Sequence, residues 1–440
     1  MKYYSTNNQA PIADLHKAVV KGLAEDRGLY MPEKINKLPK EFFDNIEKMS
    51  FQEIAYTVAS AFFGEDVDPD ALHDIVYDTL QFDCPVVNVK DNIYTLELFH
   101  GPTLAFKDVG ARFMARLLQY FIKQENNHKE VNVLVATSGD TGSAVANGFL
   151  GVDGIHVYVL YPKGKVSPIQ ECQFTTLGKN ITAIEVDGVF DDCQALVKNA
   201  FMDAELNEHM KLTSANSINV ARFLPQAFYY FNAYARMKKI ANTQHLSPNT
   251  QLVMCVPSGN FGNICAALFG HEMGLPIKRF IAANNANDIF YNYLQTGKYE
   301  PKPSKQTLAN AMDVGDPSNF ARIYDLYGKS HAKITSLISG ATYSDEQIKA
   351  TMRECYKDSG YILDPHGACG YQALKDGLQA GEVGVFCETA HPAKFKEKVD
   401  DILGIDVEIP ERLAAFMRGQ KQSVPMSKDF ADFKAFLMKQ

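Results

Sequence analysis

The sequence of 440 residues predicts an α/β protein with two lobes, each built on a mainly parallel sheet, and a helical N-terminal layer. Helical patterns fill the stretch up to residue 90. Beyond it, short β-branched runs alternate with helical stretches, which is typical of parallel sheets wrapped by helices. The runs form two groups separated by "LSPNT" at residues 246–250.

This order of helical and strand patterns predicts three consecutive domains. The N-terminal helical domain takes residues 1–95, the smaller α/β lobe residues 96–245, and the larger lobe with C-terminal helices residues 246–440. The stretch "PKPSKQ" at 301–306 has the composition of a flexible connector.

Two helices of the N-terminal layer carry start signals. "SFQEIAYTVASAFF" opens with Ser50 and Glu53 at capping-box spacing, and its apolar residues then follow one stripe. In "DPDALHDIVYDTL", Asp68 can cap the helix and Pro69 suits its first turn.

The predicted strands all lie beyond residue 90. They are "VNVLVAT" (131–137), "IHVYVLYP" (155–162), "ITAIEV" (181–186), "QLVMCVPSG" (251–259), "IKRFIAAN" (277–284) and "VGVFCETA" (383–390).

Composition excludes several classes of protein. The net charge is -8, and lysine and arginine form no patch that could follow a phosphate backbone, so we expect no nucleic-acid partner. The polar start and the lack of a long apolar run predict no signal peptide and no membrane span. The eight cysteines form no CxxC pair and several lie in apolar runs, which indicates free thiols of a cytoplasmic protein and no metal site.

Two strands run into glycine-bearing loops and then helices, in "LVATSGDTGSAVANGF" (134–149) and "CVPSGNFGNICAALFG" (255–270). Each loop places backbone N–H groups and a helix N-terminus at the carboxyl edge of a sheet, where an anion can bind. A single loop of this kind could be only a tight turn. Two such loops, one in each lobe, favour anion binding.

A dinucleotide site is the obvious competitor. It needs an acid at the end of the strand after the loop, to hold the ribose. The strand after the first loop ends near Lys163 and Lys165, and the strand after the second near Asn284 and Asn285. Neither supplies the acid, and neither loop has the Gly-Lys-Ser/Thr of a P-loop.

Lys107 in "HGPTLAFKDVGARF" is either a surface lysine or a buried reactive amine when judged by its neighbours alone. A cofactor with a phosphate and an aldehyde would use one anion-binding loop and the lysine, and leave the second loop for a substrate anion. Pyridoxal phosphate (PLP) is such a cofactor. The chemistry requires Lys107 to be neutral when it attacks, so its pKa must fall well below about 10.4.

Six ordered motifs resemble the threonine synthase family of fold-type II PLP enzymes. They are "HGPTLAFKD", "TSGDTGSA", "SGNFGN", "TLANAMDVGDPSNF", "DPHGACGY" and "ETAHPAKF", and the N-terminal "YYSTNNQAP" segment is similar to the family's opening. The resemblance spans essentially the whole chain and implies a fold like that of the tryptophan synthase β subunit.

The resemblance implies that Lys107 binds the cofactor aldehyde covalently and then moves protons at the substrate carbons. The cofactor phosphate would be held by Gly259, Asn260, Phe261, Gly262 and Asn263. Thr389 would hydrogen-bond the pyridine nitrogen, and a hydroxyl partner does not force that nitrogen to be protonated.

The same resemblance places the substrate. Its α-carboxylate would bind the first loop, at Thr137, Ser138, Gly139, Asp140 and Thr141. Relatives that make cysteine carry Asn in place of Asp140, and two acceptors do not pair without a proton, so contact of Asp140 with the phenolic oxygen stays open.

Asn216 and Arg222 lie in a segment that resembles the family's Asn-Ser-x-Asn-x-x-Arg element and would bind the substrate phosphate. The planar arginine fork suits two phosphate oxygens. An ion pair on the lobe surface is the alternative for Arg222.

Four other polar residues are left out of the catalytic set. His366 and His391 lie in turns beside Pro or Gly, where hydrogen-bonded structural histidines are common. Asp108 and Arg112 are four residues apart, which predicts a pair on the helix surface.

The implied reaction converts O-phospho-L-homoserine and water to L-threonine and phosphate. A related phospho-lyase or a serine/threonine dehydratase that releases a 2-oxo acid is the alternative. A non-catalytic binding protein is disfavoured, because it would not need a lysine amine beside two anion-binding loops.

Overall fold

The computed structural model describes residues 1–127, 129–244, 247 and 249–440 and divides into two compact units. Unit 1 contains Met1, residues 31–101 and residues 223–408. Unit 2 contains residues 2–30, 102–222 and 409–440.

Among the described residues of unit 1, one sheet has six strands in the order β12-β11-β10-β13-β5-β4. The central strands pair in parallel, and β4 is antiparallel to β5 at one edge. The strands are β4 (Val86–Lys90), β5 (Ile93–Glu97), β10 (Gln251–Pro257), β11 (Arg279–Asn284), β12 (Ile338–Thr342) and β13 (Glu382–Glu388). Buried Val, Ile, Phe and Cys side chains fill the central strands, as expected for a sheet covered on both faces.

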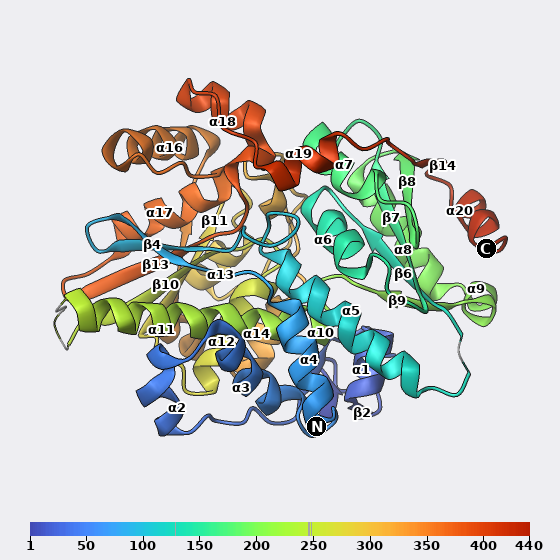
Figure 1. Ribbon diagram of the computed structural model, residues 1–440, viewed down its shortest axis with the longest axis horizontal. Coiled ribbons are helices and arrows are strands. Elements are labelled where there is room, and N and C mark those ends of the chain that lie inside the picture. Colours follow the sequence, from blue (N-terminus) through green and yellow to red (C-terminus); the bar gives the residue numbers. More distant parts are fainter. Residues whose placement is uncertain (128, 245–246, 248) are drawn as a thin grey trace. The chain divides into compact units, whose positions relative to one another are not determined.

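Two helices of unit 1 begin at the caps that the sequence predicts. Ser50 and Glu53 form the predicted capping box of α3, and Asp68 caps α4. The α-helices are α2 (Lys40–Asn45), α3 (Phe51–Phe63), α4 (Pro69–Thr79), α11 (Ala227–Gln244), α12 (Gly262–Glu272), α13 (Ile289–Thr296), α14 (Phe320–Leu326), α15 (His331–Leu337), α16 (Asp345–Ser359), α17 (Pro365–Gly377) and α18 (Lys396–Leu403). The α17 helix packs along β13 and β10 and therefore covers the centre of this sheet (Figure 1).

Unit 2 contains a parallel sheet in the order β14-β8-β7-β6-β9. Its strands are β6 (Val131–Ala136), β7 (Ile155–Pro162), β8 (Ile181–Asp187), β9 (Lys211–Ser214) and β14 (Val424–Ser427). Its α-helices are α1 (Leu15–Lys21), α5 (Lys107–Gln124), α6 (Asp140–Phe149), α7 (Pro168–Thr175), α8 (Phe190–Met202), α9 (Ala204–His209), α19 (Glu411–Met417) and α20 (Phe430–Leu437). The short α10 (Val220–Phe223) follows β9.

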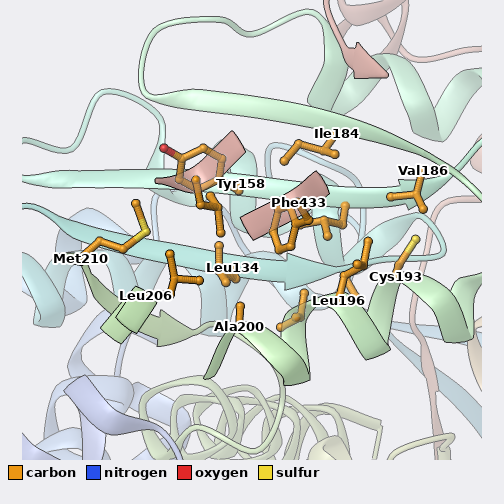
Figure 2. Close-up of a cluster of buried hydrophobic side chains, with 14 residues drawn as sticks. Leu134, Tyr158, Ile184, Val186, Cys193, Leu196, Ala200, Leu206, Met210 and Phe433 are labelled. Carbon is orange, nitrogen blue, oxygen red and sulfur yellow. The ribbon is translucent and has the colours of Figure 1, made fainter. Parts of the chain in front are cut away.

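The C-terminal segment is an integral part of unit 2. Figure 1 shows β14 and α20, at the red end of the sequence, beside β8, with which β14 pairs in parallel. Phe433 and Leu437 of α20 are fully buried in a cluster with Leu134 of β6 and Leu196 of α8, and Figure 2 shows Phe433 inside this cluster. The end of the chain therefore completes the core of a unit whose central strands lie more than 200 residues earlier.

The six predicted strands are confirmed, and the sheets are mainly parallel as predicted. The compact units, however, do not follow the three consecutive segments 1–95, 96–245 and 246–440. Strand pairing is the reason, since β5 pairs with β13 and β14 pairs with β8. Two residues of the predicted separator, 246 and 248, lie outside the described residues.

The N-terminal layer is less purely helical than predicted. Strands β1 (Lys2–Ser5) and β2 (Ala13–Asp14) pair antiparallel before α1, and β3 (Tyr30–Pro32) follows it. The predicted flexible connector at 301–306 has no regular secondary structure, and all of its residues are exposed.

Candidate active site

Lys107 is the first residue of α5, and its side chain is only partly exposed. Its Nζ donates a hydrogen bond of 2.9 Å to Thr141 Oγ1 and lies 5.6 Å from the centroid of the Phe106 ring. The positive end of a helix dipole disfavours a charged ammonium group. Lys107 is therefore held by a hydrogen bond at a helix N-terminus and is not fully exposed, and its role as a reactive amine stays a prediction.

Asp108 corrects the prediction of a helix-surface pair with Arg112. Its side chain is 1% exposed and accepts hydrogen bonds from Thr103 N at 2.9 Å and Thr103 Oγ1 at 2.5 Å. These bonds close the turn ahead of Lys107, in which Leu104 has φ of +60°. Such strained backbone persists only where its surroundings hold it, so Asp108 helps to fix the entry to the helix that begins at Lys107.

The first glycine loop joins β6 to α6 and is shaped by Thr137. Its Oγ1 accepts hydrogen bonds from Gly139 N at 2.9 Å and Gly142 N at 2.8 Å. Gly139 has φ of +151°, and a Cβ there would lie 2.6 Å from Gln170 Nε2, so only glycine fits. The first N–H groups of α6, at Asp140 and Thr141, have no intrahelical acceptor and can bind an anion.

Gln170 on α7 is a residue that sequence reasoning missed. Its Nε2 donates to Asp140 Oδ1 at 3.1 Å, and its Oε1 accepts from Ser167 Oγ at 3.0 Å. Both Gln170 and Asp140 are buried. Asp140 is therefore held by a neutral donor, and only the packing of α7 on α6 brings the two together.

Arg222 is buried, which excludes the predicted alternative of a surface ion pair. It is 3% exposed, and its Nη1 donates to Ala215 O. Burial lowers the pKa of Arg222 to about 10, and the charge of Asp108 works against that shift. The guanidinium therefore binds the backbone of the segment that contains Asn216, so direct phosphate binding by Arg222 stays a prediction.

Asn219 organises the same segment and was not among the predicted site residues. Its Nδ2 donates to Val19 O at 2.8 Å, and its Oδ1 accepts from Ala221 N at 3.0 Å. The side chain is fully buried. Asn219 is the second Asn of the Asn-Ser-x-Asn-x-x-Arg element, and this pattern could have indicated it from the sequence.

The second glycine loop, in unit 1, leads from β10 into α12. Phe261 is the cap residue with φ of +66°, a conformation that bulky residues rarely adopt. Packing of its ring on Phe290, with centroids 4.5 Å apart, helps to hold it. Asn263 Oδ1 accepts from Ser258 Oγ at 2.7 Å, and Asn263 Nδ2 donates to Pro257 O at 2.9 Å. The loop is thus rigid. Ile264 N donates to Asn263 Oδ1 at 2.9 Å, and the N–H groups at the very start of α12 have no backbone carbonyl acceptor within the helix.

Gly259 and Asn260 touch a second segment of unit 1. A Cβ on Gly259 would lie 2.9 Å from both Ala311 O and Met312 Cα. Asn319 N donates to Asn260 O at 3.1 Å. The loop is therefore supported by the backbone of residues 311–319.

Thr389 is 6% exposed and follows the last residue of β13. Near it, His391 Nδ1 accepts from Ala393 N at 3.0 Å and caps a short helix, η4 (Pro392–Phe395). His366 is also hydrogen-bonded, to Asp364 and to Ala311 N. Both histidines are thus hydrogen-bonded as predicted, and their absence from the catalytic set stays a prediction.

The remaining findings concern the whole chain. All eight cysteines are free, and seven are buried. No helix among the described residues is long and apolar enough to cross a membrane.

Each unit has features that suit a different part of a cofactor with a phosphate and an aldehyde. Unit 1 has a rigid loop, closely approached at Gly259, that leads into the N-terminus of α12, where an anion can bind. Unit 2 has the partly buried amine of Lys107 and a second glycine loop at the N-terminus of α6. These residues fit the phosphate and the aldehyde of PLP.

Comparison with known proteins gives the class. Residues 82–387 match the family model described as pyridoxal-phosphate dependent enzyme, so the chain is a PLP-dependent enzyme. Residues 2–80 and 367–437 match the models described as threonine synthase N terminus and threonine synthase, C-terminal.

Full-length relatives define the family. Threonine synthase of Serratia marcescens is 44% identical over 438 residues, with 100% of this chain and 99% of the relative covered. The crystal structure of threonine synthase from Escherichia coli matches with a TM-score of 0.91 at 43% identity, covering 100% of both chains. PLP-bound threonine synthase from Brucella melitensis has a TM-score of 0.92 at 33% identity, covering 100% of this chain and 99% of that chain. The chain belongs to the threonine synthase family, fold-type II lyases that use PLP.

Proposed function

We propose that Lys107 is the residue that binds PLP covalently and then carries protons to and from the substrate carbons. The observation that carries this proposal is the hydrogen bond of 2.9 Å from Lys107 Nζ to Thr141 Oγ1. It holds the amine at the N-terminal end of α6, where the first glycine loop would receive a substrate carboxylate. A proton carrier must lie within hydrogen-bond reach of the reacting atoms, and this placement supplies that reach.

The cofactor phosphate is assigned to Gly259, Asn260, Phe261, Gly262 and Asn263, and the pyridine nitrogen to Thr389. The N-terminal N–H groups of α12 support the phosphate assignment. The burial of Thr389 supports a hydroxyl partner, since a buried hydroxyl needs a hydrogen bond.

The substrate is assigned to unit 2. The α-carboxylate binds the loop from Thr137 to Thr141, and the substrate phosphate binds Asn216 and Arg222. The buried guanidinium of Arg222 supports this, because a phosphate would stabilise the charge that burial disfavours.

The reaction is conversion of O-phospho-L-homoserine and water to L-threonine and phosphate. The bound cofactor supplies an electron-withdrawing ring that makes the protons at Cα and then Cβ removable. Lys107 takes the α-proton and then one proton from Cβ, which allows phosphate to leave from Cγ. Lys107 returns a proton to Cγ, water adds at Cβ, and a proton returns to Cα. The cytoplasm is the proposed location, and the free cysteines support a reducing compartment.

Product analysis tests these roles. The protein is incubated with O-phospho-L-homoserine, and phosphate and threonine are measured together. Lys107→Ala should lose at least about a thousandfold in the formation of both, because it removes the proton carrier and the covalent anchor. Lys123→Ala, on the exposed end of the same helix, should retain activity. Formation of 2-oxobutyrate as the main product would instead support the eliminating enzyme.

A further inference from the structure

A buried polar cluster in unit 1 lies outside the proposed contacts to cofactor and substrate. It consists of Asp364, His366 and Glu388, of which none is more than 2% exposed. We propose that His366 is a positioning residue of the cofactor-phosphate loop: its ring holds Ala311, and the backbone at Ala311 and Met312 holds Gly259. The proposal rests on the assignment of residues 259–263 to the phosphate.

The first step is the contact between His366 and Ala311. Ala311 N donates to His366 Nε2 at 3.1 Å. A nitrogen that accepts a hydrogen bond carries a lone pair, so the proton of the neutral ring lies on Nδ1. The Nδ1 atom lies 2.5 Å from Asp364 Oδ2 and donates to it.

The second step is the rigidity of Asp364. This residue caps α17: its Oδ1 accepts from Gly367 N at 2.7 Å, and its own N donates to Glu388 Oε1 at 2.8 Å. Burial by itself would raise the pKa of Asp364, but interactions with His366 and Glu388 outweigh it and lower that pKa. The ring of His366 is therefore fixed by an ionised carboxylate at the start of a long helix.

The third step is the segment that contains Ala311, residues 307–313. Its two ends are tied together, because Thr307 N donates to Asp313 Oδ2 at 3.0 Å. Asn285, at the end of β11, donates to both Ala309 O and Asp313 Oδ1 at 3.0 Å. His366 supplies a contact at the middle of this segment, between the anchored ends.

The fourth step is the contact with the loop. A Cβ on Gly259 would lie 2.9 Å from Ala311 O, so the two backbones approach more closely than a residue with a side chain would allow. The position of Ala311 therefore limits the space in which the loop can lie at Gly259. Loss of the His366 contact should therefore change the loop at the point where it leaves β10.

The experiment compares two probes, PLP and pyridoxal, which lacks the phosphate. Dissociation constants are measured on the apoprotein by fluorescence titration, and the ratio of pyridoxal to PLP constants reports the phosphate contribution alone. Two matched amide variants differ in the length of the side chain, and therefore in how far from the backbone the acceptor lies. His366→Gln can place an acceptor near the position of Nε2, whereas the shorter His366→Asn cannot reach Ala311.

His366→Asn should lower the ratio about tenfold, because Ala311 N loses its acceptor and the loop is no longer held. His366→Gln should remain within about threefold of the wild type. Equal ratios for the two variants, whether both low or both normal, would overturn the positioning role. The absorbance of bound pyridoxal should be unchanged in both, because Lys107 is not altered.

Asn260→Asp separates this proposal from the phosphate assignment. It places a negative charge on an exposed loop residue without changing its size, and should lower the ratio about tenfold or more by repulsion. If Asn260→Asp lowers the ratio and His366→Asn does not, the assignment stands and the positioning role fails. An unchanged ratio in Asn260→Asp refutes the phosphate assignment itself.

Hydrogen exchange tests the same contact without a substitution. In the wild-type apoprotein, the Ala311 amide should exchange at least about tenfold more slowly than an unprotected amide. Exchange at the unprotected rate would show that His366 does not hold Ala311, even if the substituted proteins failed to fold.

Discussion

The two ends of strand β13 hold two glutamates, Glu382 and Glu388, in opposite states. Both are buried. Glu382 Oε2 lies 2.6 Å from Arg279 Nη2, and its Oε1 lies 3.0 Å from Lys278 Nζ. These cations, led by the hydrogen bond from Arg279, lower the pKa of Glu382 to about 2. Burial raises the pKa of Glu388 well above its usual value, and the nearby Asp364 carboxylate adds to that effect.

The opposite pKa shifts of Glu382 and Glu388 show that the two edges of the sheet differ in how they hold a buried carboxyl group. At the amino edge, Glu382 is paired with opposite charges, so its ionisation stabilises the fold. At the carboxyl edge, burial and the Asp364 carboxylate disfavour the charged form of Glu388, so its ionisation opposes folding. The carboxyl edge also holds the second glycine loop and Thr389, to which we assign the cofactor, so a destabilising glutamate lies beside the proposed site.

Asp364→Ala should give the largest effect at the carboxyl edge. It removes the cap of α17 and the acceptor of His366, and we expect a loss of about 4 kcal/mol in the free energy of unfolding. Urea unfolding of the apoprotein measures it, and the affinity for PLP should fall at the same time. A loss below about 1 kcal/mol would contradict the geometry at His366.

Glu382→Gln should destabilise the amino edge by about 2 kcal/mol at pH 7, because Arg279 and Lys278 lose their partner. The folded-state pKa lies below the usual 4.5, so the stabilisation is complete above pH 4.5 and disappears as the pH falls toward 2. Unfolding curves of variant and wild type should therefore converge in acid. The affinity for PLP should not change, in contrast to Asp364→Ala.

Local sequence patterns predicted the features that depend on neighbouring residues, and they did not predict the contacts between residues far apart in the chain. The six strands, the capping box of Ser50 and Glu53, the Asp68 cap and the two glycine loops depend on neighbouring residues. Asp108 shows where this fails, since a four-residue spacing to Arg112 predicts a surface pair whatever covers that face of the helix. Its burial is set by tertiary packing.

The contacts that the sequence did not predict join residues distant in the chain. Gln170 reaches Asp140 across 30 residues, and His366 reaches Ala311 across 55. The parallel pairing of Val424 with Ile184 spans more still and determines which unit the end of the chain joins. Side-chain patterns give no signal for such pairs, because each partner is consistent with many neighbours until the sheets are assembled.

Glu388→Gln should give the smallest effect, and with the opposite sign. The amide copies the shape of the protonated acid but needs no proton, so the variant should gain about 1 kcal/mol over the wild type at pH 7. Above the unfolded pKa of 4.5, wild-type stability falls by up to about 1.4 kcal/mol per pH unit, so the gain should grow with pH. Unfolding at pH 5, 7 and 8 measures this trend. If the gain over the wild type is absent or does not grow with pH, Glu388 is ionised in the folded protein, and the contrast with Glu382 disappears.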